Sequence, residues 1–239
     1  MLTKKVLKLK QWISESDNIV FFGGAGVSTE SGIPDFRSAD GLYYLKYEYP
    51  PETILSHSFF MKNTREFYNF YKDKMIYDNV KPNITHLRLA DLEEKGRLKA
   101  VITQNIDGLH QEAGSKNVLE LHGSILRNYC MDCSQFYSIA YIQEAKEIPR
   151  CKCGGIIKPD VVLYEEALDD NTVTKAIQSI SSADVLIIGG TSLSVYPASG
   201  LIRYYKGNKM VLINKSVTPY DGEADLLIQA GLGEVFKDI

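Results

Sequence analysis

The sequence lacks the features that would place it in a membrane or on a nucleic acid. None of its apolar stretches approaches the roughly 20 residues that a membrane-spanning helix requires. Lys and Arg number 27 and Asp and Glu number 30, which gives a net charge of −3, so no excess of positive charge is present to bind a phosphate backbone. The 239 residues, 44% of them hydrophobic, are enough for one domain with a small insert. We therefore expect a globular protein with neither a membrane nor a nucleic-acid partner.

The N-terminal segment also lacks the unbroken apolar centre of a signal peptide. Lysines are mixed there with Leu2, Val6, Leu9 and Ile13, a spacing typical of an amphipathic helix. We therefore expect a cytoplasmic protein. Cysteine is scarce as well, with four residues in the chain, and in a reducing compartment these are expected to remain thiols.

All four cysteines lie in one short stretch. The pattern is Cys130-x2-Cys133, then 17 residues, then Cys151-x-Cys153, and such paired hooks can place four thiolates around a tetrahedral Zn²⁺. Two disulfides are one alternative, but a bridge within the second pair would close a very tight ring. A redox function of the first pair is another, and it leaves the second pair unexplained. Because four thiolates leave no position for a reacting water, we predict a structural zinc ion that holds a small insert.

Six short apolar segments predict the strands of a parallel sheet. They are Ile19–Phe22, Ala100–Ile102, Val118–Leu121, Val185–Ile188, Met210–Ile213 and the weaker Leu226–Ile228. Helical patterns separate several of them, as in an α/β fold with helices on both faces of the sheet. We predict that residues 1–39, 85–123 and 158–239 form a Rossmann-like domain. An aromatic-rich helical flap at 40–84 and the zinc module at 124–157 would form a small domain.

Glycine or small polar residues follow five of these strands. In chain order they are Gly24, Ala25 and Gly26; Gln104, Asn105, Ile106 and Asp107; His122; Gly190, Thr191 and Ser192; and Asn214 and Lys215. Because ligands bind beyond the carboxyl ends of parallel strands, these residues predict one site along a single edge of the sheet. His122 shares that edge with amides and a carboxylate, which makes it a candidate general base. His86 and His110 fall in helical patterns and are expected to be structural.

The first glycine loop departs from an ordinary dinucleotide-binding motif. Residues 24–37 read GAGVSTESGIPDFR, with Thr29 where G-x-G-x-x-G has its third glycine. The P-D-F-R that follows does not continue a crossover helix. A hydride-transferring dehydrogenase would leave this segment unexplained, and the sequence also lacks the carboxylate that such enzymes use to bind ribose after a second strand.

Several motifs in register resemble the sirtuin family of NAD-dependent protein deacylases. Besides residues 24–37 they are TQNIDGLH (103–110), LHG (121–123), the four cysteines, GTSLSVYPA (190–198) and LIN (212–214). The match runs through nearly the whole chain and suggests a compact prokaryotic member. It implies that NAD is a co-substrate, that Zn²⁺ is structural, and that the substrate is a protein or peptide with an acetylated lysine. The acetyl or other neutral acyl group would pass to ADP-ribose while nicotinamide is released.

The resemblance also implies a set of site residues. His122 would deprotonate a ribose hydroxyl, and Asn105 and Asp107 would complete the catalytic set. The implied NAD contacts are Gly24, Ala25, Gly26, Thr29, Asp35, Phe36, Arg37, Gln104, Asn105, Ile106, Asp107, His122, Gly190, Thr191, Ser192, Asn214, Lys215 and Leu232. Of these, Asp35 and Phe36 would belong to a mobile loop that closes over the nicotinamide.

Two positions depart from the family pattern, and two other functions remain as alternatives. Glu165 stands where the family usually has the glycine of F-G-E, in a strand that pairs with the substrate, and it could favour basic peptides. Tyr71, three residues after Tyr68, stands where members that remove acidic acyl groups carry arginine, so neutral acyl groups are expected. An NAD-dependent ADP-ribosyltransferase would use the same pocket but tends to lack the histidine found here as His122. A non-catalytic NAD or ADP-ribose sensor would not need that histidine. The sequence carries no signal of oligomeric state.

Overall fold

The computed structural model describes residues 2–35 and 48–239. Phe36 and Arg37 lie outside these ranges. The α-helices are α1 (Leu2–Ser14), α2 (Pro51–Ile54), α3 (His57–Lys62), α4 (Thr64–Lys74), α5 (Ile84–Glu94), α6 (Leu109–Glu112), α7 (Ile139–Glu144), α8 (Asp170–Ser182) and α9 (Leu232–Phe236). The strands are β1 (Ile19–Gly23), β2 (Leu98–Thr103), β3 (Val118–Glu120), β4 (Gly123–Cys130), β5 (Phe136–Ser138), β6 (Ile157–Val161), β7 (Val185–Gly189), β8 (Met210–Ile213) and β9 (Leu226–Ile228). Short 3-10 helices include η1 (Ala25–Val27), η2 (Thr29–Ser31), η4 (Ala198–Tyr204) and η5 (Asp221–Glu223).

Six parallel strands form the central sheet, in the order β3-β2-β1-β7-β8-β9. All six predicted strands are confirmed. Phe21 of β1 lies opposite Val101 of β2 on one side and Ile187 of β7 on the other. From β1 the chain runs outward to β3, and from β7 it runs outward in the opposite direction to β9. The boundary between β1 and β7 is therefore the switch point at which sheets of this kind bind ligands.

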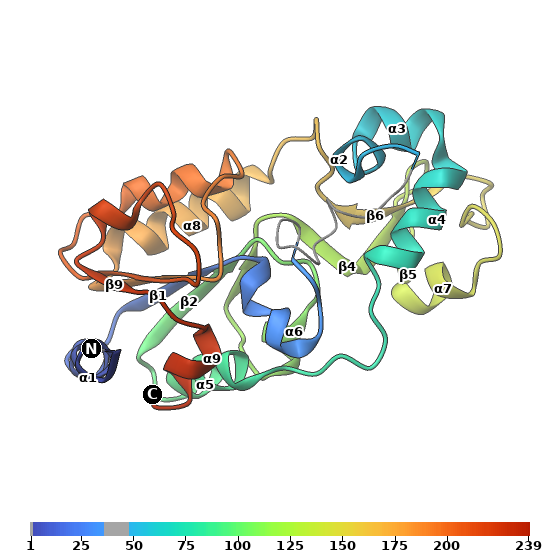
Figure 1. Cartoon of the computed structure of the whole chain (residues 1–239). Helices are drawn as coiled ribbons and strands as arrows, with labels where there is room; N and C mark the ends of the chain where they lie inside the picture. Colours follow the sequence, from blue (N-terminus) through green and yellow to red (C-terminus); the bar gives the residue numbers. More distant parts are fainter. Residues whose placement is uncertain (1, 36–47) are drawn as a thin grey trace.

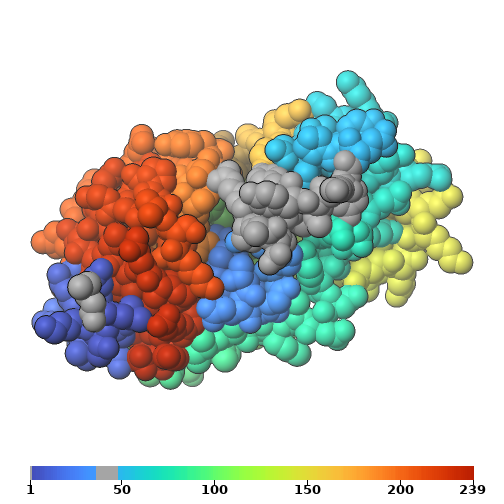
Figure 2. All heavy atoms as spheres, viewed as in Figure 1, coloured from blue at the N-terminus to red at the C-terminus, as the bar shows by residue number. Residues whose placement is uncertain are grey.

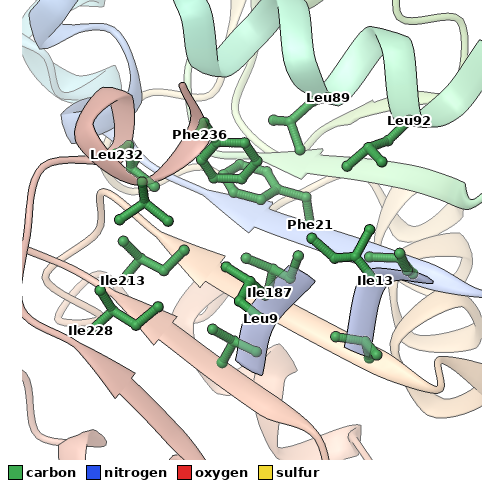
Figure 3. Packing of buried hydrophobic residues seen from close by; sticks show 14 of the residues in the cluster. Leu9, Ile13, Phe21, Leu89, Leu92, Ile187, Ile213, Ile228, Leu232 and Phe236 are labelled. Carbon is green, nitrogen blue, oxygen red and sulfur yellow. The ribbon is translucent and has the colours of Figure 1, made fainter. Parts of the chain in front are cut away.

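Alternate residues of these strands supply two separate cores, because successive side chains of a strand point to opposite faces. Phe21, Ile187 and Ile213 pack with residues of α1, α5 and α9. Figure 3 shows this first core, in which the rings of Phe21 and Phe236 lie edge to face. Residues such as Phe22 pack on the other face with α8 and η4. In Figure 1, α8 lies on one side of the sheet and α5 and α9 on the other, which confirms the predicted covering of both faces.

A small lobe lies beside the sheet, with α2, α3, α4 and α7 around a three-stranded sheet of order β5-β4-β6 (Figure 1). Its strands are antiparallel. Helix α4 lies within the segment predicted as an aromatic-rich helical flap, and its Phe67, Phe70 and Tyr71 are buried. These rings pack with Ile125 and Ile157 from the small sheet into one cluster. The flap and the cysteine module therefore share a core that is separate from those of the large sheet.

The two lobes meet where β3 passes into β4. His122 lies between these strands, and Gly123 begins the small sheet with a φ of +75°. A Cβ on Gly123 would lie 1.9 Å from the carbonyl oxygen of Asp160, so only glycine permits this close approach. Figure 2 shows the segment after β1 at the surface between the lobes. Within residues 2–35 and 48–239, no helix is both long and apolar enough to cross a membrane.

Candidate functional site

Two glycine loops meet at the carboxyl ends of β1 and β7. The Gly26 amide donates to the Gly190 carbonyl at 2.8 Å, and the Gly24 amide donates to the Gly189 carbonyl at 3.4 Å. A Cβ on Gly26 would lie 2.8 Å from the backbone of Gly190, so this glycine is required by the contact between the loops. Two of the three amides of residues 24–26 are thus used within the protein. Among the residues that the structure describes, the Ala25 amide has no partner and can donate to an anion.

Ser28 connects the first glycine loop to the loop that follows β2. Its hydroxyl donates to Asp107 Oδ2 at 2.6 Å and accepts from Asn105 Nδ2 at 3.0 Å. The second oxygen of Asp107, Oδ1, accepts from the Leu109 amide at 2.9 Å. Asn105 and Asp107, which the sequence places after the same strand, are therefore held together by a buried hydroxyl.

Sequence reasoning missed Ser28 as a site residue. The side chain is 1% exposed, and its two partners lie more than 75 positions further along the chain. A signal was present, since Ser28 is a small polar residue inside the same glycine-rich loop as Gly24 and Gly26. Its role depends on which loop packs beside it, and the sequence does not reveal that neighbour.

Gln104 reaches from the end of β2 to the end of β7. Its Nε2 donates to Thr191 Oγ1 at 3.1 Å, and the same oxygen accepts from the Leu193 amide at 3.2 Å. On the opposite side of this loop, Ile106 packs against the core of the small lobe, and its carbonyl accepts from the Ile125 amide at 3.0 Å. The loop after β2 therefore bridges the glycine loops and the small lobe.

His122 lies at the same edge, and one of its ring nitrogens is hydrogen-bonded to the protein backbone. Its Nδ1 is 2.9 Å from the backbone carbonyl oxygen of Gln104. Because a carbonyl only accepts hydrogen bonds, Nδ1 carries the proton and the neutral ring keeps its lone pair on Nε2. Burial lowers the pKa of His122 below 6.5, while the bond to Gln104 opposes part of that shift. The imidazole is therefore neutral at pH 7 and can accept a proton at Nε2.

A buried histidine pair lies behind these loops. The rings of His86 and His110 meet edge to face with centroids 4.7 Å apart. His86 Nδ1 accepts from the Asn83 amide at 3.2 Å, and Asn83 Nδ2 donates to the Val27 carbonyl at 2.8 Å and to Ser31 Oγ at 3.0 Å. Asn83 therefore ties the start of α5 to the first glycine loop. The expectation that both histidines are structural agrees with this burial.

Three of the predicted NAD contacts lie beyond β8 and at α9. Leu232 packs against the end of β7, since a Cβ on Gly190 would come within 2.9 Å of its Cδ1. The Asn214 side chain donates to the Ser216 carbonyl at 3.0 Å, and Lys215 is exposed.

The remaining predicted contacts lie in the segment after β1 and in the loop after β7. Thr29 Oγ1 donates to the Gly26 carbonyl at 3.1 Å. Asp35 is the last described residue before the gap, and Ser192 is exposed.

The four cysteines form a cluster in the small lobe that fits a zinc ion. Their Sγ atoms all lie within 4.8 Å of one another. The distances from Cys130 to Cys153, from Cys133 to Cys151 and from Cys133 to Cys153 are each 3.5 Å, near the roughly 3.8 Å edge of a tetrahedron with Zn–S bonds of about 2.3 Å. None of the four is in a disulfide. The Tyr137 hydroxyl donates to Cys151 Sγ at 3.1 Å, a contact that would support the thiolate. The sequence prediction of a four-thiolate zinc site agrees with this geometry.

Comparison with known proteins places this geometry in a family. The model of the Sir2 family matches residues 24–197. An NAD-dependent protein deacetylase of Clostridium acetobutylicum is 60% identical over 243 residues, which cover 100% of this chain and 99% of that protein. The corresponding deacetylase of Clostridium perfringens is 64% identical over 239 residues, which cover 98% of each protein. A Sir2 structure described as holding a deacetylated p53 peptide and 3′-O-acetyl-ADP-ribose superposes with a TM-score of 0.89 at 39% identity, covering 97% of this chain and 96% of that one.

Proposed function

The chain belongs to the Sir2 family, and from that premise we propose that it is an NAD-dependent protein deacetylase. It removes acetyl groups from lysine side chains of proteins or peptides and consumes NAD as a co-substrate. The products are the free lysine, nicotinamide and O-acetyl-ADP-ribose. The observation that carries the proposal is His122, which presents a neutral Nε2 at the switch-point edge of the sheet.

The proposed reaction begins when the acetyl oxygen attacks the anomeric carbon of the NAD ribose and nicotinamide leaves. His122 Nε2 then takes the proton of a ribose hydroxyl, and that hydroxyl oxygen attacks the carbon of the resulting imidate. The protonated His122 returns this proton to the lysine nitrogen, the carbon–nitrogen bond breaks, and the lysine amine leaves. Water then adds to the acetyl carbon, and the bond from that carbon to the anomeric oxygen breaks, which leaves the acetyl group on the attacking hydroxyl of ADP-ribose. Asn105 and Asp107, held together through Ser28, orient the ribose and the nicotinamide amide during these steps.

In this proposal different parts of NAD lie at the ends of different strands. The phosphates lie at the glycine loop, near the Ala25 amide and Thr29. Gln104 and Ile106 contact the ribose and nicotinamide portions. The adenosine half lies toward Gly190, Thr191, Ser192, Asn214, Lys215 and Leu232. The close packing of Leu232 on the end of β7 supports this placement.

We propose neutral acyl groups as substrates, with acetyl first. The position that carries arginine in members acting on acidic acyl groups is Tyr71, which is buried in the small-lobe core together with Tyr68. Neither side chain carries a positive charge to pair with a carboxylate at the end of an acyl chain.

The zinc ion is a structural component in this proposal. Cys130, Cys133, Cys151 and Cys153 would hold it, and it would cross-link the small lobe without taking part in the reaction.

We propose a cytoplasmic location, which the four unpaired thiols support. We also propose that residues 1–39, 85–123 and 158–239 form the NAD-binding domain, with 40–84 and 124–157 as the small domain. The separate hydrophobic clusters support a division into two domains, but Val161 and Leu163 pack in the small-lobe cluster, so the boundary near residue 158 falls within the small lobe.

The test is mass spectrometry of the purified protein incubated with NAD and acetyl-, butyryl- or succinyl-lysine peptides, beside a His122→Ala variant. The proposal requires O-acyl-ADP-ribose from the acetyl and butyryl peptides, and a rate reduced about 10²- to 10⁴-fold in the variant. Circular dichroism of the variant serves as the folding control.

Other outcomes of this experiment would identify the alternatives. Transfer of ADP-ribose onto protein without loss of the acyl group would indicate an ADP-ribosyltransferase. Binding of NAD without turnover of NAD or peptide would indicate a sensor. Either result would contradict the deacetylase proposal.

A further inference from the structure

Glu165 occupies a backbone conformation that normally belongs to glycine. Its φ is +76°, and the Glu166 amide donates to the Leu163 carbonyl at 3.0 Å, so residues 163–166 form a turn with Glu165 at the third position. A positive φ at that position is typical of a type II turn and favours glycine there. The left-handed region disfavours residues with a Cβ. Some other interaction must therefore hold glutamate in place.

That interaction is made by the carboxylate with the start of α3. Glu165 Oε2 accepts from the Ser58 amide at 2.8 Å and from the Ser58 hydroxyl at 2.6 Å. These two bonds, the hydroxyl first, lower the pKa of Glu165, so the side chain is charged at neutral pH. The Glu165 carboxylate is thus hydrogen-bonded to Ser58 of the flap. This contact argues against the expectation that Glu165 favours basic peptides.

The Glu166 carboxylate also binds the turn to α3. Glu166 Oε1 lies 2.8 Å from His57 Nδ1, and Glu166 Oε2 accepts from Lys158 Nζ at 3.0 Å and from the Leu163 amide at 2.9 Å. Successive residues of the turn therefore bind successive residues of α3. Ser56 and Tyr164 add a parallel backbone bridge between the same two segments.

The turn is continuous with the backbone that contacts His122. The Val162 amide donates to the His122 carbonyl at 3.0 Å. Among the described residues, the Val162 carbonyl and the Glu165 amide have no hydrogen-bond partner. An extended peptide can pair with such free groups on a strand edge. The position of the turn therefore decides where a peptide would lie relative to His122.

We propose that Glu165 is a positioning residue for the acylated peptide. By binding Ser58, it holds residues 162–166 against α3 and presents their free backbone groups at a fixed distance from His122. The inference rests on the proposed deacetylase function, since it assigns to this segment the peptide that the reaction consumes. It also explains how a glutamate can replace the glycine of F-G-E, because the carboxylate supplies bonds that offset the unfavourable φ.

The discriminating variant is Glu165→Gly, which relieves the backbone and removes the carboxylate. We expect the KM for the acetylated peptide to rise about tenfold, while kcat and the KM for NAD stay within about twofold, because only peptide binding is altered. The melting temperature should not fall. Glu165→Gln keeps an oxygen that accepts from Ser58, and its peptide KM should lie close to that of the unaltered protein. Glu144→Gln, which removes one exposed charge from the same lobe, is the matched control.

A peptide KM in Glu165→Gly within twofold of the unaltered protein would overturn the proposal. So would an equal rise in the KM for NAD, which would indicate a general loss of structure at the site. Hydrogen exchange of the Ser58 amide provides a readout that does not depend on activity. Faster exchange in Glu165→Gly supports the contact, and equal exchange in the two proteins overturns it. If the unaltered protein fails to deacetylate any peptide, the proposed function is wrong, and the exchange result still decides whether Glu165 holds the turn.

Discussion

Every residue of β1 and β7 is buried, whereas every residue of β5 in the small lobe is partly or fully exposed. The six-stranded sheet has helices on both faces and derives its stability from two hydrophobic cores. The small sheet shares one aromatic core with the flap helices and lies next to four thiols. Because the strand β5 of the small sheet is exposed and four thiols lie beside this sheet, we expect the small lobe to depend on a metal cross-link more than the larger one does.

The contrast bears on function because the candidate site lies where the lobes meet. In our proposal the six-stranded lobe provides the strand ends that bind NAD, and the small lobe provides the turn at residues 163–166 and the flap that hold the peptide. His122 is the last residue before the small sheet begins. A change in the small lobe should therefore affect peptide binding more than NAD binding, and a change in the six-stranded lobe should do the reverse.

Removing the zinc ion is expected to have the largest effect. Without four bound thiolates the small lobe should lose its structure, because a structural zinc site contributes folding energy directly. Deacetylation should be abolished. Hydrogen exchange by mass spectrometry should show lost protection in β4, β5 and β6 and retained protection in β1, β2 and β7. A metal-free protein with full activity, verified by metal analysis, would contradict this difference between the lobes.

Truncating Phe21 should destabilise the six-stranded lobe strongly. Its ring is fully buried against Phe236 and His110, and Phe21→Ala should cost about 3–5 kcal/mol in the free energy of unfolding. Phe136→Ala in the small lobe is the matched control. Its ring is 49% exposed, so the change should stay within about 0.5 kcal/mol. Urea unfolding measures both, and equal losses would show that the two lobes do not differ in this way.

The buried histidine pair should make the six-stranded lobe sensitive to acid. Burial lowers the pKa of His86 to about 4, against a smaller opposing effect of Asp107. Burial and the neighbouring His86 lower the pKa of His110 to about 3. Below pH 6.5 the unfolded chain binds protons that the folded chain does not. The stability is therefore complete above pH 6.5 and falls toward pH 4, by at most about 1.4 kcal/mol per pH unit for each histidine.

Urea unfolding at pH 7.5, 6.5 and 5.5 measures this slope. The variant His110→Phe removes one titrating group while keeping an aromatic ring, so its stability should depend less steeply on pH. An unchanged slope in the variant would show that His110 does not contribute to the acid sensitivity.

The ion pairs of Arg127 at the junction of the lobes should have the smallest effect. Arg127 of β4 binds Glu120 of β3 at 2.6 Å and Asp160 of β6 at 2.7 Å. Its side chain is 39% exposed, so Arg127→Gln should cost at most about 1 kcal/mol. Lys95→Gln, which breaks an exposed pair within one lobe, is the control. A loss of several kcal/mol in Arg127→Gln alone would mean that this contact governs how the lobes are joined.

The large sheet could be predicted from the sequence because its strands are apolar throughout. Segments such as Val185–Ile188 and Met210–Ile213 have few alternatives to a buried strand, and both occur as expected. The strands of the small sheet were not identified. β5 has three residues, and β4 mixes buried and exposed positions without a regular alternation, so neither carries a clear periodic signal.

The sequence by itself determined which residues occupy the strand ends and that four thiols form one cluster, because both follow from short-range order along the chain. Only the tertiary structure decided which of those residues touch. Ser28 meets Asp107 across 79 positions, and Ser58 meets Glu165 across 107. Contacts of that range depend on how distant segments pack in three dimensions, and local sequence patterns do not reveal which residue will lie opposite.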